Sequence, residues 1–183
     1  MIPRSTVCSG DAVYLSRPSM ADGPEFLSAV SKSAALHQSW VEPPGSESTY
    51  KSYIDRLSQE THFGFFIRLK TGDDLVGVVN ISEVVWGVFR SGYLGYYGFE
   101  PFVGRGLMKE GMVCVLKAAF DSLNLHRLEA NIQPENTSSI GLIQACGFRH
   151  EGFSKNYLHI QGQWRDHERY AMTQEDFQSI SAG

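Results

Sequence analysis

The stretch from Tyr93 to Lys109 constrains the fold more than any other part of this chain. Its sequence, YLGYYGFEPFVGRGLMK, predicts a strand, a glycine loop and the start of a long amphipathic helix, with no linker between them. Gly104 and Gly106 permit backbone conformations and close approaches that a Cβ would block, so several N–H groups can converge on one anion. The helix start adds free N–H groups and the positive end of its dipole. We therefore predict a phosphate cradle here, with the long arm of a nucleotide cofactor along the preceding strand.

The length and composition of the chain predict one globular domain. A chain of 183 residues can bury a substantial core but is too short for two comfortable domains. Its hydrophobic share of 42% and charged share of 20% are ordinary globular values. We expect the domain to span residues 1–183, with its core at about residues 11–177.

The net charge of the chain limits the kinds of partner that we expect it to bind. A net charge of −4 gives no broad basic field, so we expect no direct binding to nucleic acid or membrane, and a basic protein segment is an easier partner. The first ten residues lack the apolar core of a signal peptide, and no apolar run is long enough to span a bilayer. The expected location is the cytoplasm, and the expected assembly is a monomer or a homodimer.

The cysteines and histidines show no metal or disulfide pattern. Cys8, Cys114 and Cys146 are odd in number and widely spaced, which favours reduced thiols, and the latter two fit small buried residues on helices. The six histidines show no HExxH spacing. We therefore expect no metal site and no catalytic cysteine.

Hydrophobic periodicity and turn residues give the order of the elements. We expect helices at 22–36, 46–57, 106–123 and 136–145, and strands at 13–15, 63–69, 75–81, 93–99, 126–133, 153–160 and 168–172. This mixture predicts an α/β sheet with helices on both faces. Asn136 suits an N-cap, and a cap can also contact a ligand, so both interpretations of this residue stay open.

Several motifs then occur in a recognisable order. The Gly104-Arg-Gly106 loop is followed by Asn136-Thr-Ser-Ser139 and by Ala145-Cys-Gly-Phe148. This set closely resembles the GNAT acetyltransferases, which use acetyl-CoA. With the run GQWRDH at residues 162–167, it is similar to the RimJ/RimL group of ribosomal-protein-alanine N-acetyltransferases, RimJ in particular. One departure is that the superfamily loop, Gln/Arg-x-x-Gly-x-Gly/Ala, keeps only its central glycine here.

The resemblance implies a fold and a cofactor site. The implied fold is a mixed, mostly antiparallel central sheet with helices on both faces and a splayed central strand at the cofactor. The implied cofactor is acetyl-CoA, released as CoA. The residues expected to hold it are Tyr97, Gly98, Phe99, Val103, Gly104, Arg105, Gly106, Leu107, Met108, Lys109, Asn136 and Ser139.

The implied reaction is attack of a neutral amine on the acetyl thioester. A protein α-amine, with a pKa of roughly 8, demands less of a base than a lysine near 10.4. Glu100, Glu129 or a carboxylate acting through water are the candidate bases, and Ser139 or Tyr157 would serve the leaving thiolate. A backbone N–H at residues 97–99 would stabilise the oxyanion.

The acceptor is the least constrained part of the prediction. Trp40 with Glu42 and Trp164 with Asp166 are expected to border its site. The resemblance favours the N-terminal α-amine of a protein, in particular alanine of a ribosomal protein. A small amine such as a polyamine, amino acid or antibiotic is one alternative, and a non-catalytic acyl-CoA-binding regulator is another.

Overall fold

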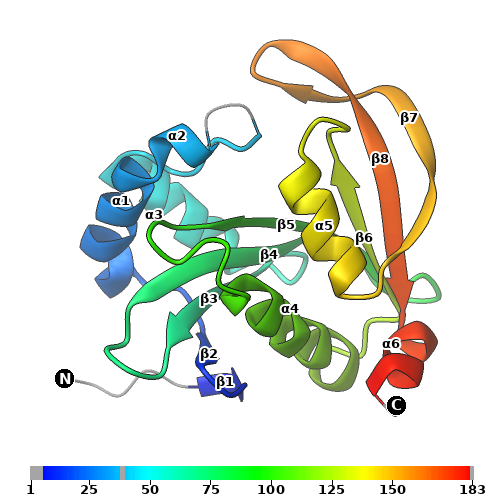
Figure 1. The fold of residues 1–183 in the computed structure, drawn as a ribbon, viewed down its shortest axis with the longest axis horizontal. Coiled ribbons are helices and arrows are strands. Elements are labelled where there is room, and N and C mark those ends of the chain that lie inside the picture. The colour runs from blue at the N-terminus through cyan, green and yellow to red at the C-terminus, as the bar shows by residue number, and fades with distance from the viewer. Residues whose placement is uncertain (1–5, 38–39, 182–183) are drawn as a thin grey trace.

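The computed structural model describes residues 6–37 and 40–181, which form an eight-stranded sheet with helices packed against it (Figure 1). The strands are β1 (Thr6–Ser9), β2 (Val13–Ser16), β3 (Phe63–Leu69), β4 (Leu75–Val85), β5 (Ser91–Gly98), β6 (Arg127–Ile132), β7 (Arg149–Ile160) and β8 (Gln163–Thr173). The helices are α1 (Gly23–Lys32), α2 (Ala34–His37), α3 (Glu47–Arg56), α4 (Leu107–Lys117), α5 (Thr137–Ala145) and α6 (Gln174–Ser181), with a 3-10 turn η1 (Met20–Asp22) and a π turn η2 (Ala118–Ser122).

The sheet changes direction at its centre. Its order is β1-β2-β3-β4-β5-β6-β8-β7, and among the described strands only β5 and β6 are parallel neighbours. These two strands pair from Ser91 with Arg127 to Leu94 with Ala130, and the pairing then stops although β5 continues to Gly98. Backbone groups beyond Leu94 therefore face a gap inside the sheet. The expected mixed, mostly antiparallel sheet is confirmed.

Helices cover both faces of the sheet, as expected. On one face, α4 and α5 bury Met112, Leu116 and Ile143 in the larger core. On the other face, α1 and α3 form a smaller core in which the rings of Phe26 and Tyr50 lie 4.8 Å apart. Because most of β3 and the first half of β4 are buried from both sides, their sequences are rich in consecutive hydrophobic residues rather than alternating ones.

Two expected helices differ in their course. The helix expected at 22–36 is divided at Ser33, where ψ is 13° and the buried side chain accepts a hydrogen bond from the Glu100 N–H at 3.0 Å. This bond ties the break to the end of β5. The helix expected at 106–123 ends its α-helical part at Lys117 and continues as η2, in which Leu123 donates to the Ala118 carbonyl five residues back.

Some elements were missed by the sequence analysis. The edge strand β1 was not expected, and neither was α6, although Thr173 and Asp176 form a recognisable helix start in which each backbone N–H donates to the other's side chain, at 3.0 and 3.3 Å. The strands β7 and β8 are longer than the predicted 153–160 and 168–172. Most β7 side chains are exposed, so hydrophobic alternation does not mark its full length.

Candidate active site

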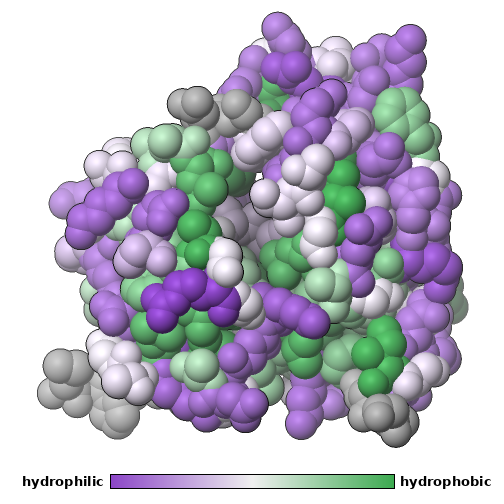
Figure 2. All heavy atoms as spheres, in the orientation of Figure 1, coloured by the Kyte–Doolittle hydropathy of each residue, from purple (hydrophilic) through white to green (hydrophobic). Residues whose placement is uncertain are grey.

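The gap between β5 and β6 opens into a cavity of about 810 Å³. In Figure 2 the face of the molecule is hollowed at its centre, between the α1–α3 side and α5. The walls combine α2 and the loop after it, the splayed part of β5, the start of α4, the end of β6, the first turns of α5, and the β7–β8 hairpin. The cavity therefore joins the predicted phosphate loop to the loops expected to border the acceptor.

The predicted phosphate cradle forms one end of this cavity. Gly104 and Gly106 have φ angles of 73° and 78°, in the left-handed region that favours glycine, and Gly106 is the N-cap of α4. None of the backbone N–H groups from Gly106 to Lys109 donates a hydrogen bond to an acceptor among the described residues. Unsatisfied donors at a helix start, next to the Lys109 ammonium, suit a pyrophosphate.

Individual cradle residues contribute in different ways. Val103, Gly104, Gly106, Met108 and Lys109 line the cavity, whereas Leu107 is buried in the larger core and Arg105 is exposed away from the lining. The Met108 sulfur packs so closely over the sheet that a Cβ at Gly77 would lie 2.3 Å from it. Met108 thus seats the helix start on β4 and β5.

The splayed part of β5 presents backbone groups to the cavity. The Phe99 N–H donates to the Val76 carbonyl of β4 at 2.8 Å, which leaves it unable to stabilise an oxyanion. Because successive backbone groups of a strand point to opposite edges, the Gly98 N–H and carbonyl point toward the gap. The Gly98 carbonyl accepts a hydrogen bond from His37 Nε2 at 2.8 Å. Within the predicted range of residues 97–99, the geometry therefore favours the Gly98 N–H as the donor to the oxyanion. The Tyr97 and Phe99 rings pack in the smaller core.

Asn136 and Ser139 meet at the start of α5. The Ser139 N–H donates to Asn136 Oδ1 at 3.1 Å, so Asn136 does act as a cap, and both residues also line the cavity. The Ser139 hydroxyl donates to the Tyr96 hydroxyl at 2.6 Å. Burial raises the pKa of Tyr96, which keeps this phenol protonated. The pair is a half-buried source of a proton beside the cavity, and the sequence analysis did not single out Tyr96.

The carboxylates named as candidate bases lie elsewhere. Glu100 is exposed and does not line the cavity. Glu129 is buried in ion pairs with Arg127 at 2.9 Å and Arg169 at 3.2 Å, so both of its oxygens are occupied. Among the described residues that line the cavity there is no aspartate or glutamate. Tyr157 is also outside the lining, and its ring packs edge-on to that of His167 at 6.0 Å.

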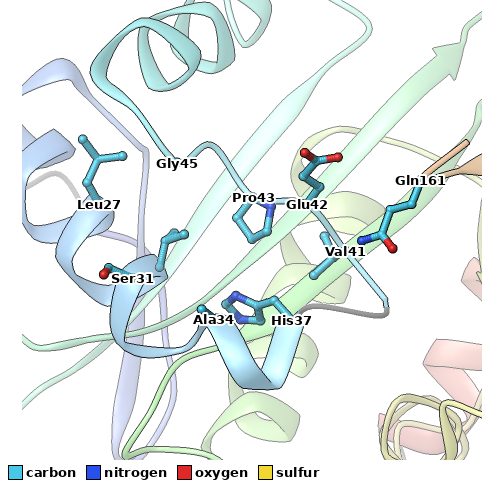
Figure 3. Close-up of a pocket in the computed structure, with 10 residues that line it drawn as sticks. Leu27, Ser31, Ala34, His37, Val41, Glu42, Pro43, Gly45 and Gln161 are labelled. Carbon is cyan, nitrogen blue, oxygen red and sulfur yellow. The ribbon is translucent and has the colours of Figure 1, made fainter.

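The structure places the residues expected to border the acceptor in different surroundings. Trp40 lines the main cavity. Glu42 lines a second, adjoining cavity of about 510 Å³, which shares His37 and Val41 with the first (Figure 3). Trp164 is 62% exposed and packs edge-on against His159, and it lines neither cavity.

The Asp166 side chain is held by a hydrogen bond within the protein and lies outside both cavities. Its Oδ1 accepts a hydrogen bond from the Asn156 N–H at 2.7 Å, within the β7–β8 hairpin. Asp166 lines neither of the two cavities. Its place in the GQWRDH run is explained by this contact, which stabilises the bulged part of the hairpin.

Two of the histidines, for which the sequence showed no motif, line the cavity. His37 lies on α2 and His167 on β8, and both are buried, at 4% and 2% exposure. Isolated histidines carry no spacing signal, and only the meeting of α2 with the β7–β8 hairpin brings them to one site. Their ring nitrogens add hydrogen-bonding groups to a lining that lacks carboxylates.

Other reactive groups are accounted for within the described residues. Burial raises the pKa of the Cys114 thiol to about 12 and that of Cys146 to about 11, which disfavours a thiolate at either position. No cluster of three His, Cys, Asp or Glu suited to a metal occurs in the described ranges. No described helix is long and apolar enough to cross a membrane.

Comparison with known proteins identifies the class of this site. The family model described as an acetyltransferase (GNAT) domain matches residues 13–149. The chain therefore belongs to the GNAT acetyltransferase family, whose members move an acetyl group from acetyl-CoA, and it is an acetyl-CoA-dependent N-acetyltransferase. The region of the match contains the splayed strand, the phosphate cradle and the start of α5.

Individual relatives point to one group within the family. The probable N-acetyltransferase YjcK of Bacillus subtilis is 30% identical over 132 residues, covering 72% of this chain and 73% of the relative. The [ribosomal protein uS5]-alanine N-acetyltransferase of Escherichia coli is 40% identical over 104 residues, covering 57% of this chain but only 54% of that enzyme. The structure of Mycobacterium smegmatis RimJ in complex with CoA-disulfide superimposes with a TM-score of 0.83 at 27% identity, covering 93% of this chain and 88% of the other. The resemblance to the RimJ-like group is confirmed.

Proposed function

We propose that this chain acetylates the N-terminal α-amine of a cytoplasmic protein, with alanine of a ribosomal protein as the favoured acceptor. The similarity to the uS5 enzyme supports this choice, although the alignment spans about half of that relative. The observation that carries the proposal is the absence of any carboxylate among the described residues that line the main cavity.

The charge of the lining discriminates between acceptor classes. A polyamine carries several ammonium groups at neutral pH, and each buried cation needs an anionic partner. The only fully charged side chain in the described lining is Lys109, which would repel such a substrate. A peptide α-amine carries a single charge, and with a pKa of roughly 8 about a tenth of it is neutral at pH 7. A peptide, which presents a single amine that can be uncharged, therefore suits this lining better than a polyamine does.

The adjoining cavity can hold the residues of a peptide that follow its N-terminal amine. It is walled by apolar residues of α1 and the loop after α2, with Pro43 beside Glu42, and Gln161 of the β7–β8 turn closes it (Figure 3). A free polyamine does not require this mixed surface, whereas a peptide needs both apolar walls and an amide partner for its backbone. The exposed Glu42 would attract a basic residue farther along the acceptor.

The catalytic groups of the proposal come from the chain itself. Acetyl-CoA supplies the activated acetyl group, with its pyrophosphate held by the N–H groups of residues 103–109. Gly98 N–H would stabilise negative charge on the acetyl oxygen, and the Ser139–Tyr96 pair would deliver a proton to the leaving sulfur. Asn136 caps α5 and fixes Ser139 beside the cavity.

The acceptor class is tested by CoA release with a panel of amines. We expect turnover on peptides that begin with Ala or Ser, at a kcat/KM about a hundredfold above that for spermidine or free lysine, equivalent to about 2.7 kcal/mol for an unpaired buried cation. The same peptides with a blocked N-terminus should be inert. The Asn136→Ala, Ser139→Ala double variant should lose most turnover. Preference for spermidine over every peptide would move the chain to the small-amine class.

A further inference from the structure

The described residues that line the main cavity include no carboxylate to act as a base, and the nitrogen bases among them are histidines. Amide formation requires the attacking nitrogen to shed a proton, and a group that takes it must reach the cavity. Among the described lining residues, the side chains with a basic ring nitrogen are those of His37 and His167. The choice therefore lies between these two rings.

Hydrogen bonds fix the tautomer of His167. Its Nδ1 lies 3.0 Å from the Arg165 carbonyl oxygen, which can only accept, so Nδ1 carries the proton. In the neutral ring, Nε2 is then the nitrogen with a free lone pair. This arrangement, with Nδ1–H held by a backbone carbonyl and Nε2 open, is the form in which histidine takes a proton from a substrate. The Tyr157 ring meets the imidazole edge-on at 6.0 Å and limits its rotation.

His37 has the opposite arrangement. Its Nε2 donates to the Gly98 carbonyl, so the lone pair is on Nδ1, which is buried without a hydrogen-bond partner. His167 Nε2 is not among the buried unpartnered atoms of the described residues. Of the two free nitrogens, the one on His167 is therefore the one open to the cavity. His37 instead holds β5 in its splayed course beside the Gly98 N–H.

From this geometry we propose that His167 Nε2 accepts the proton from the acceptor amine. The inference rests on the proposed transfer to an amine and names its base. In the step, the nitrogen lone pair forms the C–N bond to the acetyl carbon, and the C–S bond breaks with its electron pair on sulfur. The surplus proton on nitrogen passes to His167 Nε2, and the sulfur takes a proton from the Ser139–Tyr96 pair. His167 then releases its proton to water, and the Ser139–Tyr96 pair regains a proton from water, so both groups return to their starting forms.

The surroundings of His167 keep it in the required form. Burial lowers the pKa of His167 below its usual 6.5, while the hydrogen bond to Arg165 and the charge of Asp166 oppose this shift. On β7 the neighbouring titratable group is the Tyr157 phenol. Asn131 on β6 and Gln133 just after it line the cavity with amides, and Lys109 and His37 lie elsewhere on the cavity wall. The ring is thus neutral at pH 7 and able to accept a proton.

The test uses His167→Asn, because the asparagine amide can place an N–H where Nδ1 was and keep the bond to Arg165 while removing Nε2. We expect kcat with an Ala-starting peptide to fall about a hundredfold, with little change in CoA affinity. The wild-type kcat should decline as pH falls through the pKa of His167, which burial sets below 6.5, and this decline should be absent in the variant. His150→Gln, on the neighbouring strand, is the matched control and should behave as wild type.

Each outcome has a defined meaning. Loss of kcat together with the acidic decline supports His167 as the base, and His167→Gln should agree if His167→Asn folds poorly. An unchanged kcat, or an acidic decline that persists in His167→Asn, overturns the proposal. If His37→Gln removes the decline instead, His37 is the base. Absence of turnover by the wild-type protein on any peptide would contradict the proposed acceptor rather than the role of His167.

Discussion

Replacing Arg68 with methionine is expected to destabilise the protein by about 3–5 kcal/mol, the usual cost of removing one partner from a buried ion pair. Arg68 lies on β3 and is fully buried. Its guanidinium binds Asp22 Oδ1 at 3.0 Å and Glu25 Oε2 at 2.9 Å, and it donates to the Asp73 carbonyl at 2.8 Å. In the variant, Asp22 keeps its hydrogen bonds from Ser19 but loses the positive charge that balances it.

The chain offers a matched control for this substitution. Lys51 and Asp55 form an i,i+4 pair on α3 at 2.6 Å, with both side chains more than 60% exposed, at 64% and 62%. Lys51→Met should change stability by only about 0.3–0.5 kcal/mol. Urea unfolding of both variants measures the difference, and Asp22→Asn in the Arg68→Met background should recover part of the loss. Equal stability of the two single variants would show that the buried pair contributes nothing beyond an exposed one.

The position of Arg68 links stability to the site. Asp22 and Glu25 begin the α1 segment, which leads through the break at Ser33 to α2 and His37. An arginine inside the hydrophobic run FFIRL is not explained by strand periodicity, and the sequence analysis made no prediction about it. Its partners are about 45 positions away, so only the packing of α1 on β3 reveals what it binds.

Local signals predicted the parts of the site that are continuous in sequence. The strand, the glycine loop and the helix between Tyr93 and Lys117 follow one another directly, and their conformations depend on neighbouring residues. The cap at Asn136 is equally local. The resemblance to a known family then supplied the mixed, mostly antiparallel sheet and its splayed central strand, which depend on strand pairings that periodicity does not encode.

The parts that were not predicted depend on contacts across the sheet. The Phe99 N–H is bonded to β4, which narrows the oxyanion donor to one residue of the predicted three. The Ser139–Tyr96 pair joins α5 to β5, and the two lining histidines come from elements 130 positions apart in sequence. Neither cavity is lined by four of the predicted site residues, namely Glu100, Tyr157, Trp164 and Asp166. The roles expected for them stay predictions.

Replacing Gly106 with valine is expected to weaken CoA binding about a hundredfold, or about 2.7 kcal/mol. Gly106 has a φ of 78°, which a β-branched residue adopts only with strain, so the chain should relax toward negative φ and turn the N–H groups of the loop away from a common point. The site around an added Cβ is otherwise open, with no atom within 4 Å. The loss would therefore come from backbone geometry and not from a clash.

A second glycine provides a control that distinguishes damage to the phosphate cradle from a general effect of backbone strain. Gly87, in the β4–β5 turn, has a φ of 74° and also has no atom within 4 Å of an added Cβ. Gly87→Val should cost a similar amount of stability, roughly 1–2 kcal/mol, yet leave CoA affinity unchanged because this turn does not line the cavity. Isothermal titration with CoA, beside urea unfolding, measures both quantities. If the two variants lost affinity equally, the effect would be one of global stability, and the N–H groups of residues 103–109 would not be the phosphate site. Selective loss at Gly106 would assign the pyrophosphate to the start of α4, which in turn aligns the cofactor arm with Gly98 and Ser139.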